Sequence, residues 1–221
     1  MRLLVTGGTG VLGRAFVPLA RAEGHRVRAP GRAELDLFDP AAVAAAAGDV
    51  DAVLHLATRI PSLAQMDQPQ AWRENDRLRA EASAVLVDAA LAADVKTYVQ
   101  PTVTFVYPDG PVTEETPVRA AVPAIMRSAL AAERQAARFA TAGRHGVVLR
   151  LGLLDGPGTG QEHPNPGPGG HAARRGCRAG ATGGAHCAQR NLQRLPRRRA
   201  GQQPALRRDD RLASPALMRA A

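Results

Sequence analysis

The stretch Val5–Ala15, VTGGTGVLGRA, lies almost at the start of the chain and decides the expected fold. The apolar run Arg2–Thr6 predicts a buried strand, and the residues after the glycines have helical periodicity. Between them, Gly7 permits a tight turn, Gly10 lets the backbone approach a phosphate, and Gly13 lets the helix pack close to the strand. Because the first turn of a helix offers free N–H groups and partial positive charge, the stretch predicts a site for a dinucleotide pyrophosphate.

Strand-like and helical segments then alternate as far as Leu151. This order predicts an α/β fold, a Rossmann-type doubly wound parallel sheet with helices on both faces. Asp39 and Pro40 are typical of an N-cap and a first helical residue. The expected strands are Arg2–Thr6, Arg26–Ala29, Asp51–Leu56, Thr97–Val103 and Gly146–Leu151, and the expected helices are Val11–Glu23, a short helix from Pro40, Pro69–Ala93 and Ala124–Ala142.

Charge divides the chain into two parts. Residues 1–155 contain 17 basic and 17 acidic residues, whereas residues 156–221 contain 12 arginines and 3 acids and therefore carry the whole net charge of +9. The second part has no Val, Ile, Phe, Tyr or Trp with which to build a core, and no sustained periodicity. We therefore expect a Rossmann domain over residues 1–158 and a basic, low-complexity tail over 159–221, disordered or not native to the fold.

Three interpretations of the tail stay open, and an out-of-frame or degenerated sequence is favoured by its Arg, Gly, Ala and Pro content. A nucleic-acid-binding arm is disfavoured because no aromatic residue is present to stack on bases. A metal site is disfavoured because the spacing of Cys177, His186 and Cys187 matches no familiar zinc pattern. We expect neither a nucleic-acid partner nor a metal.

Several motifs together resemble the extended short-chain dehydrogenases/reductases, also called the NAD-dependent epimerase/dehydratase family. The resemblance runs from Met1 to about Gly158 and implies a Rossmann domain. In full-length members of the family a substrate lobe follows this domain. The tail of this chain is too short and too poor in β-branched residues to form such a lobe. The motifs are TGGTGVLG (6–13), ELDLFDP (34–40), VLHLAT (53–58), REND (73–76) and VVLRLGLLDGPG (147–158).

The resemblance also implies which residues bind the cofactor. The segment RAPGR (28–32) follows the second strand, where an acid binds the ribose 2′-hydroxyl of NAD and a basic residue accommodates the 2′-phosphate of NADP. The segment contains no acid and ends in Arg32, so NADP is favoured over NAD. The implied cofactor residues are Gly7, Thr9, Gly10, Val11, Leu12, Gly13, Arg32, Asp36, Leu37, Leu56, Ala57 and Thr58.

The family's proton relay, a Tyr-x-x-x-Lys pair on one helix, is missing. The segment SALAAE (128–133) resembles the family's SKLAAE, and this alignment puts Ile125 at the tyrosine position and Ala129 at the lysine position. The family's serine position falls on Val103, so the flanking Thr102 and Thr104 are the candidate catalytic hydroxyls, with Thr102 the better placed.

We therefore expect a cytoplasmic NAD(P)-binding protein that acts as an oxidoreductase or epimerase on a small carbonyl or sugar-like substrate. Its partner would be this small molecule, with no membrane association, because no apolar run reaches the length of a membrane span. The alternative is a non-catalytic protein that senses NADP or binds a partner through the same fold. His55, at a strand end, is expected to be packed or hydrogen-bonded rather than to act as a base.

Overall fold

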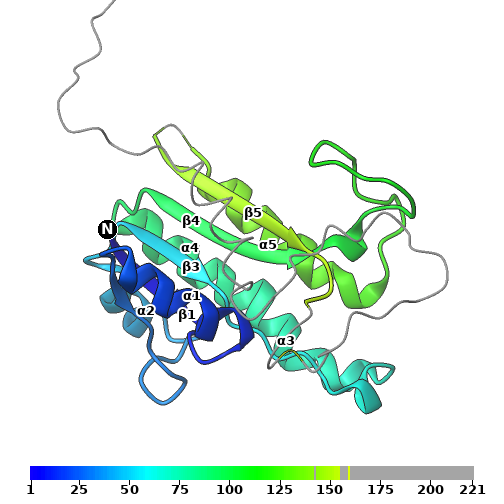
Figure 1. The fold of residues 1–221 in the computed structure, drawn as a ribbon, viewed down its shortest axis with the longest axis horizontal. Helices are drawn as coiled ribbons and strands as arrows, with labels where there is room; N and C mark the ends of the chain where they lie inside the picture. Colours follow the sequence, from blue (N-terminus) through cyan, green and yellow to red (C-terminus); the bar gives the residue numbers. More distant parts are fainter. Residues whose placement is uncertain (142, 155–158, 160–221) are drawn as a thin grey trace, which may run out of the picture.

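The computed structural model describes residues 1–141, 143–154 and 159, so the predictions made for the tail lie outside the described residues apart from Thr159. Five strands form one parallel sheet in the order β2-β1-β3-β4-β5 (Figure 1). The strands are β1 (Arg2–Thr6), β2 (Arg26–Arg28), β3 (Ala52–His55), β4 (Thr97–Val103) and β5 (His145–Leu151). The predicted doubly wound sheet is confirmed.

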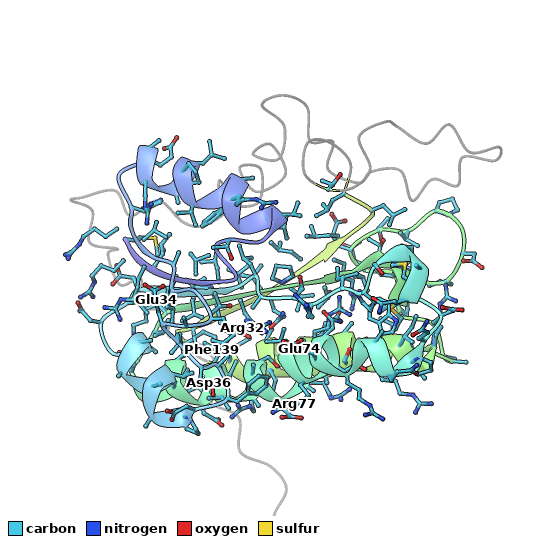
Figure 2. All side chains as sticks on the ribbon, turned by 90° about the horizontal axis from the view of Figure 1, so that it is seen from below. Arg32, Glu34, Asp36, Glu74, Arg77 and Phe139 are labelled. Carbon is cyan, nitrogen blue, oxygen red and sulfur yellow. The ribbon has the colours of Figure 1, made fainter. Side chains whose placement is uncertain are left out.

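Helices cover both faces of the sheet. Helix α1 (Val11–Ala22) packs on one face, and α2 (Pro40–Ala47), α4 (Ser83–Ala92) and α5 (Arg127–Phe139) pack on the other (Figure 2). Alternate strand residues divide between the two cores because successive side chains of a strand point to opposite faces. In β1, Leu3 and Val5 contribute to the core under α1, whereas Leu4 contributes to the core under the other helices.

Local sequence explains how two of these helices begin. The Asp39 carboxylate accepts hydrogen bonds from the backbone N–H groups of Ala41 (2.9 Å) and Ala42 (3.3 Å), and Pro40 occupies the first turn of α2, as predicted. Helix α1 begins differently, because its N-cap is Gly10, which has no side chain to satisfy the first N–H groups. Those groups remain available to a ligand.

The predicted helix Pro69–Ala93 is helical throughout but is not one α-helix. A 3₁₀ turn (Pro69–Trp72) leads into α3 (Arg73–Arg77), and a π-helical turn (Leu78–Ala82) separates α3 from α4. The Ser83 hydroxyl donates to the Arg79 carbonyl oxygen at 2.5 Å, so a side chain binds a backbone carbonyl of the π-helical turn, where the regular α-helical hydrogen bonds are interrupted. Single π-helical turns are rare in proteins, and those that do occur are often found at functional sites.

Candidate functional site

A cleft of about 1030 Å³ opens at the edge of the sheet where the parallel strands end. Because all the strands run in the same direction, the loops that follow them meet at this edge. Every residue predicted to bind the cofactor lines the cleft except Gly13. Of the two candidate catalytic hydroxyls, Thr102 lines the cleft, and Thr104 is not among the described residues that do so.

The glycine turn forms the floor of the cleft beside the start of α1. Gly7 has a φ of +72°, and a Cβ on it would lie 2.5 Å from the backbone nitrogen of Ala57. The Gly10 N–H donates to the Gly7 carbonyl oxygen at 3.0 Å and closes the turn. Gly13 lies behind the turn, where a Cβ would collide with that same carbonyl and with Gly8. Gly13 therefore allows the helix to approach, while the turn and the uncapped helix end fit a pyrophosphate.

At the end of the cleft next to β2, Arg32 is held by an acid from a distant part of the chain. Its Nη2 lies 2.6 Å from Glu74 Oε1, and Arg59 Nε lies 3.7 Å from the other oxygen of the same carboxylate. Figure 2 shows Arg32 and Glu74 facing one another. A second acid, Glu34, folds back and accepts a hydrogen bond from the Gly31 N–H at 2.6 Å. This end of the cleft is thus lined by the Arg32 guanidinium and the Glu74 carboxylate, and Glu34 binds the Gly31 backbone beside them.

The structure places Thr102 in a charged network that links β4, β5 and α5. Its hydroxyl donates to Glu133 Oε1 at 2.8 Å, and Arg150 donates to both oxygens of the same carboxylate at 2.9 and 2.6 Å. The guanidinium of Arg150 also lies 4.7 Å from the centre of the Tyr107 ring. The carboxylate of Glu133 raises the pKa of Arg150. Since the Thr102 proton is taken by Glu133, the hydroxyl can present only its lone pairs to a ligand.

Among the described residues, no tyrosine or lysine lines the cleft. Ile125 lines it, and Ala129 is fully buried in α5. Tyr98 is buried in the core and donates to Gln100, and burial raises the pKa of its phenol. Lys96 pairs with Asp94 at 2.6 Å. Ile125 and Ala129 thus stand where the alignment puts the family's Tyr-x-x-x-Lys pair, and neither side chain can transfer a proton.

His55 is a structural residue, as the sequence suggested. Its Nε2 lies 2.9 Å from the Leu78 carbonyl oxygen, which can only accept, so Nε2 carries the proton and Nδ1 accepts from the Thr6 hydroxyl at 2.7 Å. The ring is 2% exposed, and this burial lowers its pKa to about 4. A neutral, fully bonded imidazole ties β1 and β3 to the π-helical turn.

Two features of the site escaped the sequence analysis. The Glu133 carboxylate that binds Thr102 was noted only as part of a motif, and Arg79, buried on the π-helical turn and lining the cleft, was not singled out.

Asn75, which the REND motif contains, is buried, and its side-chain oxygen accepts from the Arg59 N–H at 3.1 Å. Within the described ranges, no group of side chains has the composition of a metal site and no helix is long and apolar enough to cross a membrane.

Comparisons with known proteins find relatives in sequence and in fold. A 3-diazoavenalumate denitrifying reductase from a Streptomyces species is 37% identical over 181 residues, covering 72% of this chain and 58% of the relative. A short-chain dehydrogenase/reductase superfamily protein from Agrobacterium tumefaciens with bound NAD superposes with a TM-score of 0.58 at 28% identity, covering 70% of this chain and 50% of that one.

An RMD from Pseudomonas aeruginosa complexed with NADPH shares the fold with a TM-score of 0.55 at 24% identity, covering 72% of this chain and 56% of that one. The chain thus spans between 50% and 58% of the length of these relatives. The model of the NAD dependent epimerase/dehydratase family matches residues 3–180, well over half of the chain. The chain belongs to the NAD-dependent epimerase/dehydratase family of the extended short-chain dehydrogenases/reductases.

Proposed function

We propose that this protein binds NADP(H) in the cleft and reduces a small-molecule substrate. The observation that carries the proposal is the glycine turn at the uncapped start of α1, which opens onto a cleft large enough for a dinucleotide and a further ligand. The Streptomyces relative is named as a reductase, and this supports reduction over epimerisation. The preference for NADP over NAD depends on Arg32.

The residues of the cleft suit each part of the cofactor. The turn from Gly7 to Leu12 would hold the pyrophosphate, Asp36 and Leu37 would contact the adenine, and Leu56–Thr58 would lie along the nicotinamide side. When bound, the nicotinamide would supply a hydride to the substrate. Thr102, fixed by Glu133, would accept a hydrogen bond from the water molecule that protonates the substrate, because a carbonyl oxygen cannot itself donate one. With Ile125 and Ala129 at the relay positions, the proton would come from water.

A second function, a non-catalytic sensor of NADP(H), is favoured by the same two positions. An isoleucine and a buried alanine cannot transfer protons, and loss of a general acid typically costs about 10²–10⁴ in rate. A sensor would bind NADPH with little turnover and would change its affinity for a protein partner when the cofactor is bound.

Titration calorimetry of the full chain with NADPH and NADH, followed by NADPH oxidation against a panel of carbonyl compounds, separates these functions. The proposed reductase binds NADPH in the micromolar range, more tightly than NADH, and oxidises it with at least one compound. Tight binding with a silent panel would favour the sensor, and absence of binding to either nucleotide would contradict both.

A further inference from the structure

Arg79 is a buried cation in the cleft wall that forms no ion pair with any described carboxylate. The residue is 4% exposed, lies on the π-helical turn and lines the cleft. Its Nε is buried without a hydrogen-bond partner, and Arg79 takes part in none of the ion pairs found among the described residues. Asp76, one turn earlier on the same helical segment, is the acid whose charge acts on Arg79, and it offsets only part of the lowering of the pKa that burial causes.

Such an arrangement is costly, because a buried charge is normally paired and hydrogen-bonded. Arg150 of β5 illustrates the usual arrangement, with two hydrogen bonds to Glu133. Arg79, by contrast, has no such partner, although its backbone is fixed: its carbonyl accepts from Ser83, and the carbonyl of its neighbour Leu78 accepts from His55. The fold thus buries the guanidinium in the cleft wall and leaves its Nε–H donor without a partner in the described chain.

The same cleft has an apolar rim. Ile60, Met66, Phe105 and Leu153 all line it and are between 39% and 60% exposed, although large apolar side chains are usually covered. They come from the loops after β3, β4 and β5, so they gather at the carboxyl edge of the sheet. A ligand that covers them must itself be apolar over much of its surface.

We propose that the substrate is a small organic acid with an apolar body, whose carboxylate binds Arg79 while its body covers the rim formed by Ile60, Met66, Phe105 and Leu153. A guanidinium matches a carboxylate geometrically, since two parallel N–H groups can donate to its two oxygens. This inference rests on the proposed function, because it names the class of substrate for the same cleft.

The phosphates of the cofactor are the other anions that could enter the cleft. The pyrophosphate already has a site at the glycine turn and the start of α1, and a 2′-phosphate would lie near Arg32 at the far end of the RAPGR segment. Arg79 belongs to neither of these elements. We therefore assign it to the substrate, and the experiment includes a test of the cofactor alternative.

The test uses trans-cinnamate and its uncharged analogue trans-cinnamamide as probes for the full-length protein, with and without saturating NADPH. Wild type binds cinnamate about tenfold or more tightly than cinnamamide, as expected for a hydrogen-bonded charge pair. In R79M this preference disappears, whereas R79K retains part of it. R77M is the matched control, since Arg77 points away from the sheet (Figure 2), pairs with Glu81 and leaves the preference unchanged.

Three further measurements separate the alternatives. NADPH affinity is unchanged in R79M if Arg79 serves the substrate, and a parallel loss of NADPH affinity would assign it to the cofactor and overturn the inference. The melting temperature of R79M is no lower than that of wild type, because an unpaired buried charge is removed; a clear decrease would make Arg79 a structural ion and also overturn it. If wild type fails to bind NADPH, the proposed function fails, while the cinnamate preference without NADPH still decides the role of Arg79.

Discussion

Glu74 holds Arg32 across the cleft, with Nη2 and Oε1 2.6 Å apart, although the two residues lie 42 positions apart in the sequence. Arg32 follows β2, and Glu74 belongs to α3, so the ion pair joins two walls of the site. The Arg32 side chain is 74% exposed, and exposed ion pairs of this kind contribute little to stability. Arg32 can therefore leave Glu74 and bind a phosphate instead with little loss of folding stability.

This exchange gives the first prediction. E74Q removes the carboxylate that competes with a 2′-phosphate, so NADPH affinity increases while NADH affinity stays the same. R32A has the opposite effect and weakens NADPH binding about tenfold, the loss expected for one charge-assisted contact. Titration of both nucleotides measures this, with E81Q as the control because Glu81 pairs with Arg77 at 3.0 Å. Equal changes for NADPH and NADH would mean that Arg32 does not bind the 2′-phosphate.

The second prediction concerns Gly13. G13A places a methyl group 2.5 Å from the Gly8 Cα and against the Gly7 carbonyl, so the turn must shift. We expect a loss of about 2 kcal/mol in unfolding free energy, typical of overpacking, together with loss of nucleotide binding. Denaturant unfolding and NADPH titration measure the two effects.

G48A is the matched control for G13A. Gly48 has a φ of −62°, and the nearest atom to its added Cβ is 3.6 Å away. An alanine there fits without strain and leaves stability and binding unchanged, or raises stability by a few tenths of a kcal/mol. If G13A bound NADPH normally, the close approach of α1 to the turn would not be needed for the site.

Much of this fold could be predicted from local sequence patterns. The glycine turn, the alternation of strands and helices, and the Asp39 cap each depend on neighbouring residues. The pairing of Arg32 with Glu74 depends on how the backbone folds over a longer distance, whereas the π-helical turn at Leu78–Ala82 and the return of Glu34 to Gly31 are local features that the sequence patterns did not reveal. The segment RAPGR contains no acid, yet the fold supplies Glu34 to it, so the charge of a short segment was an incomplete guide to the nucleotide end of the cleft.

The third prediction concerns Glu133. E133A leaves Arg150, whose side chain is 22% exposed, without its partner, and it also frees the Thr102 hydroxyl. Breaking a fully buried pair costs about 3–5 kcal/mol, and the partial exposure of Arg150 reduces our expectation to about 2 kcal/mol. E81A, which breaks an exposed pair, should cost less than about 0.5 kcal/mol in the same denaturant experiment. Similar losses in both variants would contradict a structural role for the network.

The fourth prediction separates the two candidate hydroxyls. Thr102 lines the cleft and is fixed by Glu133, whereas Thr104 begins the 3₁₀ turn Thr104–Val106 and accepts, through its carbonyl, a hydrogen bond from the Tyr107 N–H. T102V therefore lowers the rate of NADPH oxidation without changing NADPH affinity, and T104V changes neither. T102S restores the rate because it restores the hydroxyl. If T102V oxidised NADPH at the wild-type rate, Thr102 would have no role in the reaction.

The last prediction uses the buried imidazole of His55. Its pKa of about 4 in the folded protein lies below the ordinary value of 6.5, so between these pH values the unfolded chain binds a proton that the folded chain does not. Stability from this group is therefore fully present above pH 6.5 and is lost as the pH falls towards 4, by at most about 3 kcal/mol. H55N has no such proton to bind, so the difference in unfolding free energy between wild type and H55N should shrink over this range. Urea unfolding at several pH values measures it, and a difference that stays constant from pH 7 to 4 would mean that the imidazole is not held neutral between Thr6 and Leu78.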